Sequence, residues 1–479
     1  MKNIFTLFIV TIFTTISFSQ ERNFNISITV KGMENQIGIL ANYYADKRMI
    51  KDTLKFDING IAIIKGKKNI PAGVYLVAFP SFRYNSFDVI IKETDFSIVT
   101  DTANFITKSV VKNSIENKQL FEDMNYMYPL GIQTDSLQKL SSKFKKTDSA
   151  YVKNQRAIEA IGKQITEHRK TIAKKYPTTL YSKLIKVMQD LDIPKNDLRN
   201  EKGALVDSFF AFHYSQQHYF DNVDFADSAL VRSPVLHGKL MKYFEQYVFP
   251  SPDSIIKYVD VVINKAKASR EMYQLVLNEL FSKYARSEIM GYDAIYVYMA
   301  EKYYLSGEAP WAEAKGLMEL RDRVEAVKPT LLGKIAPNFT AQDTLGKNYT
   351  FHDFVPKNKY TLLVFWNSDC GHCQKEIPAL KQLYSDSLKQ LGVRLFTCST
   401  EQTDSSFRTF VAKNCSPDWI TCADMRGMSA FRKEYDLIVT PRLFLITPDY
   451  KILAKNIPLE NLVDFIKFQD GLITKKEEK

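Results

Sequence analysis

Two cysteines placed between an apolar run and a helical pattern constrain the fold of this chain most strongly. Cys370-Gly371-His372-Cys373 follows directly on the apolar run Leu362–Trp366, and the apolar spacing after Cys373 is helical. A short apolar run beside a helical pattern is typical of a buried strand that leads into a helix. From residue 332 onward such strand and helix patterns alternate, which predicts an α/β domain at this end of the chain.

The spacing of the two cysteines favours thiol-disulfide exchange. With Cys370 at a helix N-terminus, the helix dipole and the unpaired N–H groups favour the thiolate, which is the species that attacks a disulfide. Cys373, one helical turn later, can resolve the mixed disulfide by attacking Cys370. The alternatives are a structural disulfide and a zinc site, but zinc needs two further ligands, and the spacing of Cys415 and Cys422 is unsuitable.

The segment Phe365–Cys373, with Pro378 downstream, resembles the thioredoxin superfamily, in particular its exported TlpA-like and ResA-like thiol-disulfide oxidoreductases. Gly333–Phe339 at the domain entrance and Val439–Pro441 further on are additional matches, and the resemblance covers roughly residues 333 to 472. It implies a thioredoxin fold whose redox group is a disulfide between the two cysteines, with no cofactor and no metal.

The resemblance also implies roles for single residues. Cys370 and Cys373 are the catalytic pair, and Pro441 is expected to form a cis peptide bond that faces them. Glu376 matches an acidic residue of this branch and is expected to take a proton from Cys373 during resolution. The alternative for Glu376 is a solvated charge on a helix. The residues expected to shape the active site and substrate groove are Trp366, Gly371, His372, Thr440 and Pro441.

Two departures from the thioredoxin pattern affect proton handling. Val364 occupies the position six residues before Cys370, where ordinary thioredoxins carry an acid, so Glu376 becomes the better proton acceptor. Asp369 replaces an aromatic residue. Its carboxylate raises the pKa of Cys370 if it points inward, whereas a protonated His372 lowers that pKa, and the sequence leaves the balance open.

The sequence therefore predicts an exported enzyme that reduces or isomerises disulfides of exported proteins. The Gly371-His372 pair occurs in protein disulfide isomerases, whose potential is about −180 mV against about −270 mV for thioredoxin. The TlpA-like resemblance indicates instead a reductant that a membrane thiol carrier supplies with electrons. Two other functions are alternatives: a peroxide-reducing thioredoxin-fold protein, whose motif is missing around Cys370, and a binding protein whose N-terminal extension is the functional part.

The first residues predict export. Lys2 and the apolar run Ile4–Phe18 have the pattern of a secretory signal over residues 1–19, which places the mature protein in the periplasm. The alternative is an uncleaved membrane anchor, for which the run is short. The net charge of +11 is spread over single lysines, so we expect no nucleic-acid partner.

The extension divides into two predicted domains ahead of the thioredoxin-like domain at residues 329–479. Alternating apolar residues predict a β-rich, sandwich-like domain over residues 20–110, with a hairpin turn at Asn59-Gly60. Helical spacing predicts an α-helical domain over residues 111–328. We expect the extension to position the redox site on a partner or to form a dimer.

The remaining candidate ligands and thiols have weaker signals. The helical domain contains His213, His218, Asp221 and Asp224, but their spacing argues against a metal site. Cys398 is expected to be a small core residue. Cys415 and Cys422 are expected either to form a second disulfide or to remain free.

Overall fold

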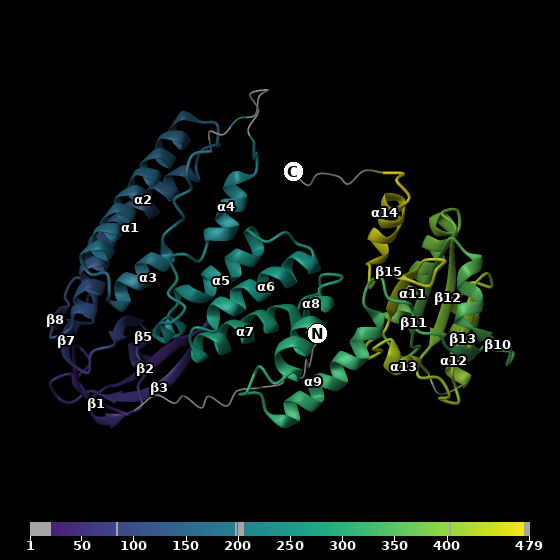
Figure 1. The fold of residues 1–479 in the computed structure, drawn as a ribbon, viewed down its shortest axis with the longest axis horizontal. Coiled ribbons are helices and arrows are strands. Elements are labelled where there is room, and N and C mark those ends of the chain that lie inside the picture. The colour runs from purple at the N-terminus through teal and green to yellow at the C-terminus, as the bar shows by residue number, and fades with distance from the viewer. Residues whose placement is uncertain (1–20, 83–84, 197–198, 200–205, 402–403, 474–479) are drawn as a thin grey trace. The chain divides into compact units, whose positions relative to one another are not determined.

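The protein has a multidomain layout, as the sequence predicts: a β-rich region, a helical region, and a C-terminal sheet covered by helices (Figure 1). The computed structural model describes residues 21–82, 85–196, 199, 206–401 and 404–473. The predicted signal sequence, residues 1–19, lies outside the described residues. The chain forms two compact units, one ending at Leu280 and one beginning at Phe281.

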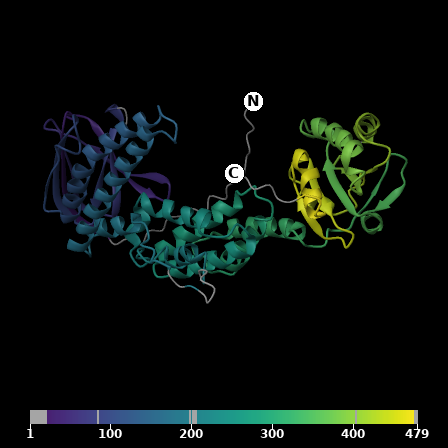
Figure 2. The same ribbon diagram turned by 90° about the horizontal axis from the view of Figure 1, so that it is seen from above.

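The β-rich region consists of two four-stranded sheets that share one apolar core. The first contains, in spatial order, β4 (Ile61–Lys68), β1 (Arg22–Lys31), β7 (Asp95–Asp101) and β8 (Val110–Lys112). The second contains β3 (Lys47–Lys55), β2 (Ile37–Tyr44), β5 (Gly73–Phe79) and β6 (Asn85–Ile91). Ile26 and Ile28 from the first sheet and Tyr75 and Val77 from the second are fully buried in that core. The region is therefore a sandwich, seen from a second direction in Figure 2.

The predicted hairpin at Asn59-Gly60 is wrong. The turn itself forms, because Gly60 has a φ of +68° and its N–H donates to Asp57. However, β3 pairs with β2, whereas β4 pairs with β1 in the other sheet. The turn therefore carries the chain from one sheet to the other.

The helical part of the first unit begins directly after β8. It contains α1 (Ile115–Ser141), α2 (Ser149–Lys175), α3 (Leu180–Met188), α4 (Phe210–His218), α5 (Val235–Gln246), α6 (Pro252–Ala266) and most of α7 (Arg270–Ala285). The buried Asn117 amide fixes α1 to β6 through two hydrogen bonds of 2.8 Å with the Ile90 main chain. The buried Glu116 carboxylate accepts from the N–H groups of Leu180 and Tyr181, at the N-terminus of α3.

The second unit begins with helical segments and continues into a seven-stranded sheet. Its elements before the sheet are α8 (Asp293–Met299), a π-helical segment (Ala300–Leu305) and α9 (Ala314–Val327). The strand order is β10 (Asn348–Thr350), β9 (Thr340–Gln342), β13 (Ile420–Ala423), β12 (Val393–Ser399), β11 (Tyr360–Trp366), β14 (Arg442–Ile446) and β15 (Ile452–Lys455). The helices are α10 (Phe351–Phe354), α11 (Cys373–Leu383), α12 (Asp404–Asn414), α13 (Phe431–Glu434) and α14 (Leu459–Gln469).

The central strand β11 is buried on both faces, which explains its unbroken apolar run. Leu362, Val364 and Trp366 belong to the core shared with α11, α12 and α14. Leu363 and Phe365 belong to the core on the opposite face of the sheet. The redox loop therefore follows the carboxyl end of a strand that has an apolar core on each face.

The second unit also includes the last helices of the predicted helical domain. On α9, Arg323 forms an ion pair with Asp436, and the Lys455 ammonium on β15 donates to Asp293 and, over 2.8 Å, to the Thr330 carbonyl. The predicted boundary between residues 328 and 329 thus falls inside this compact unit. In the described part of the chain, no helix combines the length and the apolarity that a membrane span requires.

Candidate active site

The two cysteines of the C-x-x-C motif lie where β11 turns into α11. The Cys370 carbonyl accepts from Gln374, and α11 is regular from Cys373 onward, so Cys370 lies just before the first helical turn. Cys370 is partly exposed, whereas Cys373 is fully buried. Both are free thiols, so the structure corresponds to the reduced pair.

The pKa values of the two thiols are shifted in opposite directions. Partial burial opposes ionisation of Cys370, but hydrogen bonds from the Cys373 N–H, the Thr440 side chain and the His372 N–H outweigh burial and lower the pKa of Cys370. Burial raises the pKa of Cys373 to about 12. The exposed sulfur is thus the better nucleophile, and the buried sulfur keeps its proton until a base removes it.

The loop before β14 lies against Cys370. The Thr440–Pro441 peptide bond is cis, as the resemblance implies. The Sγ of Cys370 lies 3.1 Å from the Thr440 carbonyl oxygen. Within the seven-stranded sheet, Phe365 of β11 pairs with Arg442 of β14, which brings this loop to the end of the strand that precedes the motif. Thr440, which lies 70 residues further along the chain, thus contacts the Sγ of Cys370.

The expected groove residues occupy two different environments. Gly371 and His372 are exposed beside Cys370, where a substrate can reach them. Trp366 is fully buried and stacks on Phe410 with a centroid distance of 4.6 Å. Trp366 was expected to help shape the active site and substrate groove, and its buried ring can do so only by packing in the core next to the redox loop.

Glu376 lies in the first turn of α11 and is partly buried. Burial raises the pKa of its carboxyl group, as does the charge of Glu460, while His372 acts in the opposite direction. A raised pKa makes the carboxylate a stronger base than an ordinary glutamate. Among the described residues, no hydrogen bond joins Glu376 to Cys373, so its role remains a prediction.

Two acidic residues near the site were missed by the sequence analysis. Glu401 is 5% exposed and accepts a hydrogen bond of 2.6 Å from the Ser368 N–H in the redox loop. Its second carboxylate oxygen has no partner among the described residues. Asp436 is 7% exposed and binds Arg442, the residue that follows Pro441. The signal for Glu401 is its place just after a buried strand next to β11.

The other thiols and histidines do not join the site. Cys398 and Cys422 face each other on β12 and β13, and both are fully buried. Cys415 follows α12, and no disulfide links these three thiols. In the first unit, His213 contacts Asp207 at 2.9 Å and His218 contacts Asp221 at 2.7 Å, so the two histidines have separate partners.

Comparison with protein families identifies two segments of the chain. A model described as the AhpC/TSA family matches residues 332–455, and this segment contains both active-site cysteines and Pro441. A model described as a domain of unknown function, DUF5106, matches residues 205–329.

Several similar proteins are named as the thiol-disulfide oxidoreductase ResA, and others as thioredoxin-like proteins. ResA from Bacillus cereus is 32% identical over 151 residues, which cover 32% of this chain and 80% of that protein. ResA from Bacillus thuringiensis is 34% identical over 124 residues, which cover 26% of this chain and 68% of that protein. Among solved structures, a domain of a possible thiol-disulfide isomerase from Cytophaga hutchinsonii has 34% identity and a TM-score of 0.28, covering 30% of this chain and 97% of that domain.

Proposed function

We propose that this chain, which belongs to the family of ResA-like thiol-disulfide oxidoreductases, uses Cys370 and Cys373 to reduce or isomerise disulfides of exported proteins. The observation that carries the proposal is the contrast between the two thiols. Cys370 is partly exposed with a lowered pKa, while Cys373 is buried with a pKa raised to about 12.

The reaction begins when the Cys370 thiolate attacks one sulfur of a substrate disulfide. A bond forms between Cys370 and that sulfur, the substrate disulfide breaks, and the other substrate sulfur leaves as a thiolate that takes up a proton. Cys373 then loses its proton, to Glu376 in this proposal, and attacks the Cys370 sulfur. The second substrate thiol is released, and Cys370 and Cys373 end as a disulfide. A dithiol donor must return two electrons before the next reductive cycle.

The surface beside the site supports a protein substrate. Ile438 and Val439, directly before Thr440, are 72% and 49% exposed. Apolar side chains at the mouth of the site can bind an apolar segment, while the Thr440 main chain can pair with an extended substrate strand.

The proposal is tested with three cysteine variants of the full chain. Cys370→Ser should abolish insulin reduction, and Cys373→Ser should accumulate a mixed disulfide that mass spectrometry detects. Cys398→Ser is the matched control, because that thiol is fully buried in the core on the opposite face of the sheet. Retained activity in Cys370→Ser would exclude the proposed chemistry.

The direction of electron flow follows from the redox potential of the Cys370–Cys373 pair. A value near that of thioredoxin, about −270 mV, supports a reductant that draws on a membrane thiol donor. A value near that of the isomerases, about −180 mV, supports disulfide shuffling.

Export and assembly form part of the same proposal. We expect residues 1–19 to be removed, so that N-terminal sequencing of the protein from the periplasm starts at Gln20. We expect the extension to bind a partner or a second copy of the chain, which light scattering of the full chain and of a variant without residues 20–280 would test.

A further inference from the structure

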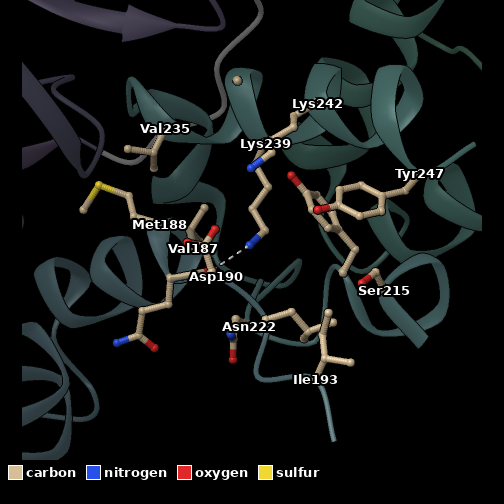
Figure 3. A pocket seen from close by; sticks show the side chains of 14 residues that line it. Val187, Met188, Asp190, Ile193, Ser215, Asn222, Val235, Lys239, Lys242 and Tyr247 are labelled. Atoms are coloured by element: carbon tan, nitrogen blue, oxygen red, sulfur yellow. Dashed lines mark hydrogen bonds between the residues drawn. The ribbon is translucent and has the colours of Figure 1, made fainter. Parts of the chain in front are cut away.

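A cavity lies in the helical part of the first unit, away from the redox residues in the sequence (Figure 3). It has a volume of about 400 Å³, which falls within the range of about 300–1,000 Å³ usual for small-molecule sites. Its wall consists of the end of α3 and the residues after it, α4 with the following turn, and one face of α5. The lining is mixed, with apolar side chains such as Val187 and Val235 next to polar ones such as Ser215 and Asn222.

Lys239 on α5 extends into this cavity (Figure 3). Its ammonium nitrogen lies 3.5 Å from the Gln189 carbonyl oxygen and 4.8 Å from the centre of the Tyr219 ring. These are a long hydrogen bond and a cation–π contact, neither of which supplies a counter-charge. Within the described ranges, neither Lys239 nor Lys242 forms an ion pair. Burial lowers the pKa of Lys239 to about 8, although Asp190 acts in the opposite direction.

The charges around the cavity favour a ligand with one negative charge. Lys239 and Lys242 contribute two positive charges and Asp190 one negative charge. The Gln189 carbonyl at the end of α3 also faces Lys239, and the negative end of the helix dipole opposes a doubly charged anion such as phosphate. Arginine, the usual bidentate partner of phosphate, is absent from the lining residues, all of which are described. The Tyr219 and Tyr247 rings and the valines suit an apolar body.

We propose that this cavity binds a small organic monocarboxylate with an apolar body, whose carboxylate pairs with Lys239. The site is independent of the redox chemistry and gives the N-terminal extension a ligand-binding function. The apolar body of the ligand lies against the tyrosine rings and the valines.

Isothermal titration calorimetry on the full chain tests the site with hexanoate and 3-phenylpropanoate as probes. The matched neutral probes are hexanamide and 3-phenylpropanamide, and inorganic phosphate is the competing anion. We expect saturable binding of at least one carboxylate, and at least tenfold weaker binding of its amide and of phosphate. The loss of a charge-assisted hydrogen bond lowers the binding affinity by a factor of about ten or more.

Three variants locate the binding. Lys239→Met keeps an unbranched side chain that is one atom shorter and removes the charge, and it should weaken carboxylate binding at least tenfold. Gly238→Leu fills the cavity from α5, where an added Cβ meets no atom within 4 Å, so it should block binding without unfolding the helix. Lys257→Met is the control, because Lys257 is exposed, lies 5.5 Å from the Tyr258 ring and does not line the cavity.

The pH dependence separates a binding role of Lys239 from a purely structural one. A bound carboxylate stabilises the ammonium form, so affinity should fall as pH rises through about 8. Asp190, Lys242, Tyr219 and Tyr247 are the other titratable groups that line the cavity, and burial raises the pKa of Tyr219 to about 12, above this range. The proposal is overturned if neither carboxylate binds, if the amides or phosphate bind as well, or if Lys239→Met and Gly238→Leu leave binding unchanged.

Discussion

Replacing Asp436 with asparagine tests whether buried charge holds the loop that carries Pro441. Asp436 accepts a hydrogen bond from Arg323, and one of 3.1 Å from Arg442. Its φ is +51°, a left-handed conformation that asparagine tolerates better than most residues. Asp436→Asn therefore keeps the backbone preference and the size of the side chain. It removes the charge and replaces one of the two accepting oxygens with an NH₂ donor, so that one of the two arginines loses its acceptor.

The expected loss of stability follows from the burial of the two arginines. The Arg442 side chain is 19% exposed, and its burial lowers its pKa, which the charge of Asp436 counteracts. Breaking a buried pair by removing one partner costs about 3–5 kcal/mol, because the other charge stays buried. The Arg323 side chain is 39% exposed, so losing its ion pair adds only about 0–1 kcal/mol.

Differential scanning calorimetry of the full chain measures the effect. At about 2–4 °C per kcal/mol for a unit of this size, the transition of the second unit should fall by roughly 6–24 °C. Asp449→Asn is the control, because Asp449 and its partner Lys451 are 58% and 56% exposed, and the expected shift is at most a few degrees. An Asp436→Asn transition within about 1 °C of the wild type would refute the reasoning, since leaving one charge of a buried ion pair without its partner should cost several kcal/mol, about 3–5.

Three further predictions concern the redox site. Because the pKa of Cys370 is lowered, its alkylation by iodoacetamide should reach half its maximal rate at a lower pH than the alkylation of free cysteine. In a Cys370→Ser variant, Cys373 has a pKa of about 12 and should stay unreactive between about pH 7 and 9. Glu376→Gln should slow release of the mixed disulfide roughly a hundredfold in stopped-flow assays, and a wild-type rate would exclude it as the base. Trp366→Ala should cost about 3–5 kcal/mol in urea unfolding, because the ring is fully buried; a cost below about 1 kcal/mol would contradict a packing role.

The C-terminal unit was the most predictable part of the fold, because its signals are local. The apolar run of β11, the helix after Cys373 and the strand after Pro441 each lie within one short segment. The strand β13 (Ile420–Ala423) was not predicted, since four residues between turn-forming neighbours give too short a pattern. Its pairing with β12 depends on tertiary contacts.

The failed hairpin at Asn59-Gly60 has a different cause. The turn chemistry was predicted correctly, because a glycine with positive φ is a local property. Whether the strands on either side pair with each other is not local, because each also presents an apolar face to the sandwich core. Here Leu54 of β3 and Ile64 of β4 enter the same core from opposite sheets.

Within the site, the sequence identified groups that act through a motif and missed groups that act through tertiary contacts. Cys370, Cys373 and Pro441 belong to short patterns with a recognisable chemistry. Trp366 belongs to the same pattern, yet its ring points into the core, because side chains alternate along β11 and position 366 falls on the α12 face. Glu401 belongs to no motif, and only the fold brings its carboxylate to the redox loop.

The last helix before residue 329 is linked to the redox loop by a series of side-chain contacts. The apolar pattern changes at the end of the helical region from helical spacing to alternating strands and helices, which predicts a boundary there. Which segments form one compact unit depends instead on contacts between residues more than a hundred positions apart, such as Arg323 and Asp436. Arg323 on α9 forms an ion pair with Asp436, which forms a second ion pair with Arg442. Arg442 directly follows Pro441, and the carbonyl oxygen of the preceding residue, Thr440, contacts the Sγ of Cys370. We therefore expect a shift of α9 to move the loop that contacts Cys370. The segment matching DUF5106 extends to residue 329 and includes α9, so its last helices belong structurally to the redox unit.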